Sequence, residues 1–384
     1  MLIPEDLIDS MRGWRQHLHQ HPEFGFEETE TARFVEERLR EFGIKKIETR
    51  VGETGVVATI SRGSSDKVIA LRADMDCLRI HETTNLPYAS TKPGLMHACG
   101  HDGHTTILLG VASMLAKEGG FDGTVLLVFQ PAEEWGQGMK AMIRDGLGSK
   151  YRFDEIYGLH NQPGLPVGSF EIRPGAYMGA EDGFKISIQG SAGHASRPHL
   201  CQDAIVCVSA IVGELQTIIS RTINPTELAV VSVTSISGEN VKNAISGEAQ
   251  IEGDCRHFDD VVSQQIEAAM HQIVKGVSEA HGCSAVLEYE RVFIPLINDP
   301  EMTGHAVDAA TTVFGSDRVS SDAAAMGASE DFARALTIAP GAFCNIGNGD
   351  SATLHSPEYN FNDDALEPGV EWFLEVVRRR LPVS

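Results

Sequence analysis

The stretch TTILLGVASMLAKEGGFDGTVLLVFQPAEE, residues 105–134, joins an apolar helix to a buried strand that ends at two carboxylates. Thr105 to Lys117 is predicted to be helical, and Thr124 to Phe129 has the length and apolar composition of a buried strand. Three more apolar runs of strand length occur in this half of the chain: Gly55 to Ile60, Val68 to Arg72 and Ile156 to Leu159. Strands that alternate with helices predict an α/β fold, with a mixed, mostly parallel sheet covered by helices.

The two ends of the chain agree with this fold. Residues 5–42 carry apolar side chains at three- and four-residue steps, interrupted at Pro22, and predict two helices. Near the other end, the apolar run Ala342 to Ile346 predicts a further strand, which leads into a loop that contains His355.

A different pattern between residues 180 and 290 predicts a second domain. Its order is strand, helix, strand, strand, helix, strand, which is typical of ferredoxin-like α+β domains. We therefore expect a domain of residues 1–179 and 291–384, with residues 180–290 inserted into it. Each helix of the insertion is expected to bury one apolar stripe. The stripes are Ile205, Val208, Val212, Leu215 and Ile219, and Val261, Ile266, Met270, Ile273 and Val277.

The composition is that of a globular protein and excludes some partners. The chain has 384 residues, of which 42% are hydrophobic and 22% charged, enough for two cores. Its formal charge is −23, and this argues against nucleic acid or an anionic membrane as the main partner. No uninterrupted apolar run approaches the roughly 20 residues of a membrane span.

The N-terminal sequence and the cysteines indicate a compartment. MLIPEDLIDSM carries three acids and no cationic stretch, so a secretory signal is not expected. Seven scattered cysteines form no paired framework, and the odd number leaves one thiol without an intramolecular partner. These features favour a reducing, cytoplasmic setting.

The densest group of metal-binding side chains is MHACGHDGH, residues 96–104. One thiol and three imidazoles lie within eight residues, just before the apolar helix, and they suit a borderline-soft metal such as zinc. An isolated cysteine or histidine is more often a packing or surface residue. Cys-x-His is not a complete site, so further ligands are expected from other parts of the chain.

Three more polar motifs lie at the ends of predicted strands. They are QPAEE (130–134), GLHN (158–161) and LHSPEY (354–359). In open α/β sheets ligands bind at the carboxyl ends of the strands, so we expect the motifs to meet there. Successive side chains of an extended turn point in different directions, so one glutamate of QPAEE can bind metal while the other faces a substrate water.

Together these motifs resemble the M20 metallopeptidase superfamily. With LHQHPEFGFEE (18–28) and RADMD (72–76), they are most similar to its branch of aminoacylases, hippurate hydrolases and plant auxin-conjugate hydrolases. The resemblance covers essentially the whole chain. It implies a zinc-hydrolase-like domain with an inserted lid and dimerisation domain. It also implies hydrolysis of the amide bond of small N-acyl amino acids to a carboxylic acid and a free amino acid.

Carried over by position, the resemblance implies a site with two divalent metal ions per subunit. Glu133 would be the general base and Asp76 a supporting acid. The thiolate favours zinc, and manganese, cobalt or nickel are alternatives. The implied metal ligands are Cys99, His101, Glu134, His160 and His355.

In the inserted domain the resemblance implies contacts with a small-molecule substrate. His194 would stabilise the oxyanion in a neighbouring subunit, which requires a homodimer or a higher homo-oligomer. Asn243 and Arg256, expected on the middle two strands, would grip the substrate's carboxylate, for which arginine offers a planar fork. The loop around Gly327 would lie beside the substrate.

Some positions depart from the family pattern or suggest another site. Arg79, Trp135 and the pair Glu181 and Asp182 are unusual, and we expect these residues to lie near the pocket wall and to affect specificity for the acyl group. None of them removes a ligand or the base.

One further group, His17, His19 and His21, resembles a metal site by composition, but a structural role is the preferred interpretation.

Two other functions are considered. The first is a dipeptidase or carboxypeptidase of the same superfamily, because a peptide bond is also an amide. The second is a metal-binding or regulatory protein on a hydrolase scaffold, which would have lost a ligand or the base, and none is missing here. The sequence contains no G-x-S-x-G elbow or P-loop, so serine hydrolase and nucleotide chemistry have no support.

Overall fold

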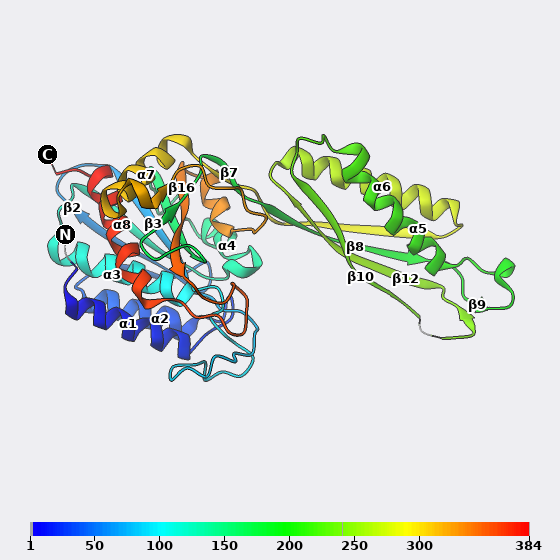
Figure 1. Ribbon diagram of the computed structural model, residues 1–384, viewed down its shortest axis with the longest axis horizontal. Coiled ribbons are helices and arrows are strands. Elements are labelled where there is room, and N and C mark those ends of the chain that lie inside the picture. The colour runs from blue at the N-terminus through cyan, green and yellow to red at the C-terminus, as the bar shows by residue number, and fades with distance from the viewer. Residues whose placement is uncertain (1–2, 240, 384) are drawn as a thin grey trace. The chain divides into compact units, whose positions relative to one another are not determined.

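The computed structural model describes residues 3–239 and 241–383, which divide into two compact units (Figure 1). Unit 1 consists of the chain up to Tyr177, Ile297–Ala325 and the chain from Glu330 onward, and unit 2 of Met178–Leu296 and Met326–Ser329. The contiguous part of unit 2 therefore extends the expected range 180–290 at both ends. It also gains a four-residue loop that the sequence pattern assigns to the other domain.

Unit 1 is built on a mixed eight-stranded sheet with the order β1-β2-β4-β3-β5-β16-β6-β15. The central strands β4, β3, β5 and β16 are parallel to one another, as predicted, and β1 and β2 add antiparallel at one edge. Strand β1 was not predicted because it is mostly exposed and polar. The strands are β1 (Lys46–Val51), β2 (Gly55–Arg62), β3 (Val68–Asp74), β4 (Gly123–Gln130), β5 (Glu155–Pro163), β6 (Phe170–Glu171), β15 (Val319–Ser320) and β16 (Gly341–Gly349).

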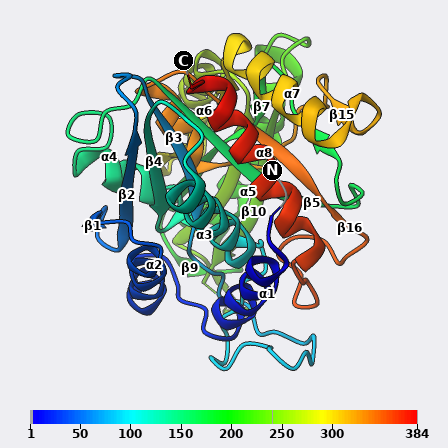
Figure 2. The same ribbon diagram turned by 90° about the vertical axis from the view of Figure 1, so that its left-hand side faces the viewer.

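Helices cover both faces of this sheet. Helices α3 and α8 lie side by side on one face, and α1 packs against both (Figure 2). Because side chains alternate along a strand, Leu71 points to α3 while Arg72 points to the opposite face, where η5 and α4 lie. The helices are α1 (Glu5–Gln20), α2 (Thr29–Glu41), α3 (His101–Glu118), α4 (Gly138–Arg144), η5 (Asp331–Thr337), α7 (Pro300–Phe314) and α8 (Leu366–Arg380).

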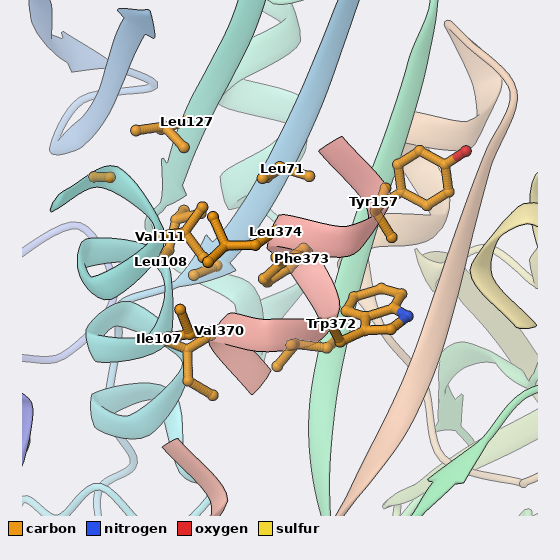
Figure 3. Close-up of a cluster of buried hydrophobic side chains, with 14 of the residues drawn as sticks. Leu71, Ile107, Leu108, Val111, Leu127, Tyr157, Val370, Trp372, Phe373 and Leu374 are labelled. Carbon is orange, nitrogen blue, oxygen red and sulfur yellow. The ribbon is translucent and has the colours of Figure 1, made fainter. Parts of the chain in front are cut away.

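The core of unit 1 fills the space between the sheet, α3 and α8 (Figure 3). Glycine lets the two helices approach closely, because a Cβ at Gly369 would lie 2.6 Å from Ile107 Cδ1. The buried side chains include Leu71, Leu127 and Tyr157 from the sheet, Ile107, Leu108 and Val111 from α3, and Val370, Trp372, Phe373 and Leu374 from α8. This packing holds the strand ends that carry the polar motifs.

Unit 2 has a four-stranded antiparallel sheet with the order β10-β12-β8-β13 and two helices on one face. The chain order of its elements and this strand order are those of a ferredoxin-like domain. Phe184, Ile186 and Ile188 alternate along β8 and are buried under the helices, as predicted. The elements are β8 (Ala180–Gln189), α5 (Ala204–Thr217), β10 (Ala229–Gly238), β12 (Glu248–His257), α6 (Asp260–Ala280) and β13 (Ser284–Phe293).

The predicted apolar stripes of these two helices are wrong at their first residues. Ile205 and Val261 are 41% and 56% exposed. Both helices carry apolar side chains on more than one face, so the large residues alone did not define which face is buried. The buried face of α5 is Ala204, Cys207, Val208, Ile211 and Leu215, and that of α6 includes Val262, Ile266, Met270 and Val274.

One helical stretch, Ala204–Thr222, is long and apolar enough to cross a membrane by length and composition, with a mean hydropathy of 1.5. It comprises α5 and the π-helical turn η3 (Ile218–Thr222). No such segment was predicted because Glu214 and Arg221 interrupt the apolar sequence. Of its most apolar window 33% is buried, and this buried side packs on the sheet of unit 2.

Candidate metal centre

The polar motifs gather at the carboxyl ends of the central strands of unit 1. The chain runs from β3 through α3 to β4, which is the neighbour of β3 on one side. It then runs through α4 to β5, which is the neighbour of β3 on the other side. The connections therefore diverge at β3. Such a switch point is where open α/β sheets bind ligands.

Cys99 and His101 are positioned by the turn that starts α3. The backbone of Gly100 is left-handed, with φ 97°, and a Cβ there would collide with Asn161 Oδ1 and Tyr359 Oη. Helix α3 begins at His101, four residues before the predicted start at Thr105. The imidazole of His101 is therefore presented by the first turn of the helix rather than by the preceding loop.

The structure brings together all five predicted ligands from four separate stretches of the chain. Cys99 Sγ lies 3.3 Å from His160 Nε2, and His101 Nε2 lies 3.8 Å from Glu134 Oε1. Glu134 Oε2 lies 3.5 Å from His355 Nε2. Ligand atoms lie within 4.8 Å of one another in each of the groups Cys99–His101–His160, Cys99–Glu134–His355 and His101–Glu133–Glu134.

The chemistry of these residues fits a metal centre. His101 Nε2 and Glu134 Oε1 are buried and have no hydrogen-bond partner within residues 3–239 and 241–383. Asp76 orients both residues: its Oδ1 lies 3.2 Å from His101 Nδ1, and its Oδ2 accepts the N–H of Glu134 at 3.1 Å. A carboxylate on the far nitrogen is typical of a histidine that binds metal. One thiol, three imidazoles and a carboxylate suit zinc and similar divalent cations.

The local structure of two ligands differs from the prediction. His160 lies inside β5, which continues to Pro163, rather than at its end. Burial and the nearby His104 lower the pKa of His160 well below its usual range, which keeps the imidazole in the neutral form that binds metal. His355 has a left-handed backbone, with φ 63°, and its N–H donates to Ala98 O at 2.8 Å. Its side chain is 54% exposed.

Glu133 is buried beside the ligands in a different environment from Glu134. Its Oε1 accepts the backbone N–H of Asp331 at 3.1 Å. Burial raises the pKa of Glu133 well above its usual range, and the negative charges of Glu330 and Glu134 add to this effect. A carboxylate with a raised pKa is a stronger proton acceptor, as a general base requires.

A layer of buried polar residues behind the ligands was missed from the sequence. Arg72 is fully buried and donates hydrogen bonds to Gln130, Asp74 and Glu330 at 2.7, 2.8 and 2.8 Å. Asp74 Oδ1 in turn lies 2.7 Å from His104 Nδ1. The available signal was an arginine and an aspartate inside an otherwise apolar strand, because buried charges are rarely left unpaired.

The histidines at positions 17, 19 and 21 contact other side chains of the protein. His19 is buried, with Nδ1 2.8 Å from Asp102 Oδ2 and Nε2 3.3 Å from Glu82 Oε1. The rings of His17 and His21 contact each other with centroids 4.5 Å apart. These contacts agree with the structural role preferred for the group.

Two of the unusual residues, Arg79 and Trp135, contact the same aromatic ring. The Arg79 guanidinium lies 3.9 Å from the centroid of Phe24, and the Trp135 ring lies 4.6 Å from it. A Cβ at Gly25 would lie 2.9 Å from Trp135 Nε1, so this glycine makes room for the indole. Trp135 follows Glu134 directly and is partly exposed, which leaves an aromatic surface next to a ligand.

Unit 2 separates residues that were expected to act together. Asn243 lies before the short strand β11 (Ala244–Ile245), which pairs with β9 (Gly193–His194), rather than on a middle strand of the sheet. Its O accepts the N–H of Ala195 at 3.0 Å, so Asn243 and the exposed His194 are neighbours. Arg256 lies near the other end of β12. At about 3.3 Å per residue, the eight steps from Glu248 to Arg256 alone span roughly 26 Å.

Arg256 instead meets the loop that contains Gly327. Arg256 Nη1 donates to Ser329 Oγ at 2.9 Å, and the N–H of Gly179 donates to Met326 O and Ala328 O at 2.9 Å. These are contacts within unit 2, and they tie the loop to the start of β8.

Glu181 and Asp182 point to opposite faces of β8. Glu181 lies beside Arg256, whereas Asp182 is buried among His257, Ser263 and Tyr289 on the helix-covered face. The expectation that both acids affect the pocket wall is therefore wrong for Asp182.

Comparisons with known proteins show similarity over most of the chain. A model of Peptidase family M20/M25/M40 matches residues 70–379. The chain is 37% identical to the hippurate hydrolase of Campylobacter jejuni, over 99% of both chains. It is 39% identical to an N-acetyl-L-cysteine deacetylase of Bacillus subtilis, over 96% of this chain and 88% of that protein.

Two solved structures are similar over nearly the whole chain. One, from methicillin-resistant Staphylococcus aureus, is described as an aminohydrolase; it has a TM-score of 0.90, 35% identity and coverage of 98% and 97% of the two chains. The other is described as a dinuclear metal-binding peptidase of the M20 family from Bacillus subtilis. It has a TM-score of 0.85, 31% identity and coverage of 98% of this chain and 99% of that chain. With its metal-binding motifs brought together in this fold, the chain belongs to Peptidase family M20/M25/M40.

Proposed function

We propose that this chain is a metal-dependent amidohydrolase that cleaves the amide bond of small N-acyl amino acids, giving a carboxylic acid and a free amino acid. The observation that carries the proposal is the convergence of five ligands around the start of α3, with Glu133 beside them. The names of two relatives, a hippurate hydrolase and an N-acetyl-L-cysteine deacetylase, support this class of substrate.

The five ligands would hold two divalent cations, as the description of the Bacillus subtilis M20 peptidase supports. When bound, the cations supply Lewis acidity that polarises the amide carbonyl and lowers the pKa of water. The Cys99 thiolate favours zinc, and manganese, cobalt and nickel are the alternatives. Asp76 would fix the ring of His101 in the orientation that binding needs.

Glu133 would move the proton in the reaction. It would accept a proton from the attacking water and then deliver it to the amide nitrogen, because an amide anion is a very poor leaving group. The hydrogen bond from the Asp331 N–H holds one carboxylate oxygen in place. Burial raises the pKa of Glu133, which favours uptake of the proton.

Unit 2 would bind the rest of the substrate. Arg256 and the Gly327 loop would hold the substrate's carboxylate, and His194 would stabilise negative charge on the tetrahedral oxygen. Because Asn243 and His194 lie at the opposite end of the sheet from Arg256, one chain cannot bring all of them to one small substrate. This separation supports a homodimer, or a higher homo-oligomer, in which His194 and Asn243 serve the partner subunit's site.

The test is a panel of N-acetyl and N-benzoyl amino acids, assayed beside dipeptides after chelation and reconstitution with single metals. We expect the chelated protein to be inactive and divalent metal to restore hydrolysis of the N-acyl amino acids. His17→Ala serves as the matched control, because this histidine lies outside the site and should leave both activity and metal content unchanged. Preferential cleavage of dipeptides would support a peptidase, and no hydrolysis by the metal-loaded protein would refute the proposal.

A further inference from the structure

His19 of α1 is a buried histidine that contacts two carboxylates at once. Its Nδ1 lies 2.8 Å from Asp102 Oδ2 and its Nε2 lies 3.3 Å from Glu82 Oε1. The side chains of the two acids are also buried, with 0% and 4% of their surface exposed. A neutral imidazole has one N–H and can donate to only one of these acids, whereas the imidazolium donates to both. The geometry therefore fits a cation that joins the two carboxylates.

The first of these carboxylates belongs to the turn that presents a metal ligand. Asp102 directly follows the predicted ligand His101 in the first turn of α3. The N-cap residue of this helix is Gly100, which has no side chain to cap it. Other polar side chains of the turn contact the end of β3 or the residues after it: His101 with Asp76, His104 with Asp74, and Thr105 with the Asp74 carbonyl. Asp102 instead ties the turn to α1 through His19.

The second carboxylate leads to the loop of another ligand. Glu82 also accepts a backbone N–H from eight residues further along the chain at 2.7 Å, which closes the loop that follows β3. The next residue, Thr83, donates its N–H to the Pro357 carbonyl at 2.9 Å. Pro357 lies two residues after the predicted ligand His355. The two ring nitrogens of His19 are thus linked to two separate ligand segments of the chain.

Arg15, one helical turn before His19, makes contacts of the same kind. Its Nη1 lies 3.6 Å from Asp102 Oδ2, and its Nε donates to Asp363 Oδ1 at 2.6 Å. Asp363 follows the His355 loop in the chain. Helix α1 therefore presents two cationic side chains to Asp102, and each of them also reaches toward the C-terminal part of unit 1.

We propose that His19 is a positioning residue of the metal centre: as a cation between Asp102 and Glu82, it holds the first turn of α3 and the His355 loop in the arrangement that binds metal. His19 acts through the two acids rather than by contact with a cation. The proposal rests on the metal ligands of the proposed function. Without the imidazolium, two buried carboxylates lose the donor that they share, so the turn and the loop lose their common support.

The experiment measures the zinc affinity of the metal-free protein by competition with a chromophoric chelator of known affinity. His19→Ala should lower the affinity at least roughly tenfold, because residues behind metal ligands typically have effects of this size. His17→Ala is the matched control: it removes a histidine from the same helix, and side chains two residues apart on a helix do not face each other. Its zinc affinity should stay within about twofold of wild type.

A second control separates positioning from a general loss of stability. Leu39→Ala truncates a buried side chain of α2 and should destabilise unit 1 without changing the contacts of His19. With every variant shown to be folded by circular dichroism, Leu39→Ala should bind zinc as the wild type does. An equal loss of zinc affinity in Leu39→Ala and His19→Ala would overturn the proposal.

Two conservative variants test the two links of His19. Asparagine places its amide N–H near the position of Nδ1, and glutamine places it near that of Nε2, so each keeps a donor to one acid. His19→Asn and His19→Gln should each recover part of the zinc affinity that His19→Ala loses. Glu82→Gln gives an independent measurement should the His19 variants fold poorly, and it should also weaken zinc binding. Affinities within about twofold of wild type in His19→Ala and Glu82→Gln would refute the role of His19.

A pH profile tests the charge of His19. Burial opposes this charge, but hydrogen bonds with the two acids outweigh it and raise the pKa of the imidazole to about 9. The link to both acids is therefore present at neutral pH and is lost as the pH rises through about 9. The charged and titratable groups that face His19 are Arg15 of α1, Glu82 and Tyr88 of the loop after β3, His97 before α3, and Asp102 of α3.

The ratio of the zinc affinities of wild type and His19→Gln gives this profile. Neutral histidine and glutamine each donate to one acid, so the ratio should approach one above about pH 9. A ratio that stays constant between pH 7 and 10 would contradict the cationic link.

Zinc binding also separates this proposal from the proposed function. Weaker zinc binding by His19→Ala, in a protein that hydrolyses no amide when loaded with metal, would support the role of His19 and refute the amidohydrolase function. Normal hydrolysis by the wild type, with unchanged zinc affinity in His19→Ala, would overturn only the role of His19. A wild-type protein that binds no zinc or other divalent metal would refute both.

Discussion

Glu133 and Glu134 are neighbours in sequence with different surroundings. Glu134 faces His101 and His355, whereas Glu133 accepts a hydrogen bond from the Asp331 N–H. Both lie in the short turn Glu133–Trp135, which follows the left-handed residue Ala132. Two carboxylates held in different environments can perform different tasks, as metal binding and proton transfer require.

Replacing Glu133 by Gln tests this division directly. We expect turnover of an N-acyl amino acid to fall by at least roughly 10²–10⁴-fold, because the amide side chain cannot accept the proton. Metal content, measured by inductively coupled plasma mass spectrometry, should stay the same. Glu134→Gln is the paired variant, and it should lose metal as well as activity. Substantial activity in Glu133→Gln would rule out its role as the base.

Arg72 permits a stability prediction in the layer behind the ligands. Arg72→Met removes the cation that faces Asp74 and Glu330 and leaves both acids buried. Breaking a buried ion pair in this way costs about 3–5 kcal/mol of folding free energy, to be measured by urea denaturation. Arg33→Met, in an exposed ion pair with Glu30, should change it by less than about 0.5 kcal/mol. Equal effects of the two substitutions would contradict the structural role of Arg72.

At the scale of elements, β8 carries an acid on each face, Glu181 beside Arg256 and Asp182 under the helices. On the helix-covered face, Asp182 Oδ2 accepts hydrogen bonds from His257, Ser263 and Tyr289 at 3.0, 2.6 and 2.7 Å. Burial opposes the charge of Asp182, but these hydrogen bonds outweigh it and lower the pKa of the carboxyl. Asp182 thus links β8 with β12, α6 and β13.

Asp182→Asn should destabilise unit 2 by about 1–3 kcal/mol at neutral pH, because it weakens three hydrogen bonds to a charged acceptor. The folded-state pKa is below the unfolded value of about 3.9, so the stabilisation is present above that pH. It is lost as the pH falls through the folded-state pKa. Urea denaturation at several pH values should therefore show the gap between wild type and variant closing below about pH 4. A gap independent of pH would contradict this account.

The elements with a clear apolar pattern could be predicted from the sequence. The apolar strands β2 to β5 and β16 were predicted because buried strands read as continuous apolar runs. Strand β1 was not predicted, because an exposed polar edge strand has no apolar pattern. The buried face of α5 was not predicted correctly, because this helix carries apolar residues on all sides. Helix α3 begins earlier than predicted because its first turn, His101 to His104, is polar and lacks the apolar pattern of the rest of the helix.

The candidate site could be predicted only where its residues lie in recognisable short motifs. The five ligands were implied by the resemblance of short motifs to a known family, and the structure brings them together. The pairing of Arg72 with Glu330 was not predictable, because the two residues are distant in sequence and neither lies in a metal-binding pattern. The separation of Asn243 from Arg256 depends on the pairing of β9 with β11. Each of these strands has only two residues, which is too short to give a recognisable sequence pattern.

At the scale of the whole molecule, the position of His194 predicts active sites shared between subunits. Mixing inactive His194→Ala with inactive Glu133→Gln should restore activity, because one site of each heterodimer then has an intact Glu133 and receives an intact His194. With random exchange of subunits about a quarter of wild-type activity is expected for a symmetric dimer. The assay needs unfolding and refolding of the mixture, with each variant refolded alone as the control. No recovery, or a fully active monomer, would contradict action across subunits.

Metal removal should also lower the stability of the molecule. Without cations, the buried Asp76 and Glu133 and the 8% exposed side chain of Glu134 lie close together with no metal charge to offset theirs. A ligand that binds only the folded state stabilises it by about 2.7 kcal/mol at 100 times its Kd. Differential scanning calorimetry should therefore show a lower transition temperature after chelation, restored by divalent metal. The variant His101→Ala should show little response, and an equal response would place the bound metal elsewhere.

The interruption of unit 1 by unit 2 has a consequence for synthesis of the chain on the ribosome. Strand β5 is complete at Pro163, but β16, which pairs with it, begins only at Gly341. At about 5–20 residues per second, the edge of β5 lacks its partner for roughly 10–40 s. Unit 2 is almost contiguous and can finish folding in that interval, whereas the nascent half of the larger sheet exposes unpaired backbone to other chains. The order of translation therefore makes this growing edge, rather than the inserted domain, the part of the protein most in need of a chaperone.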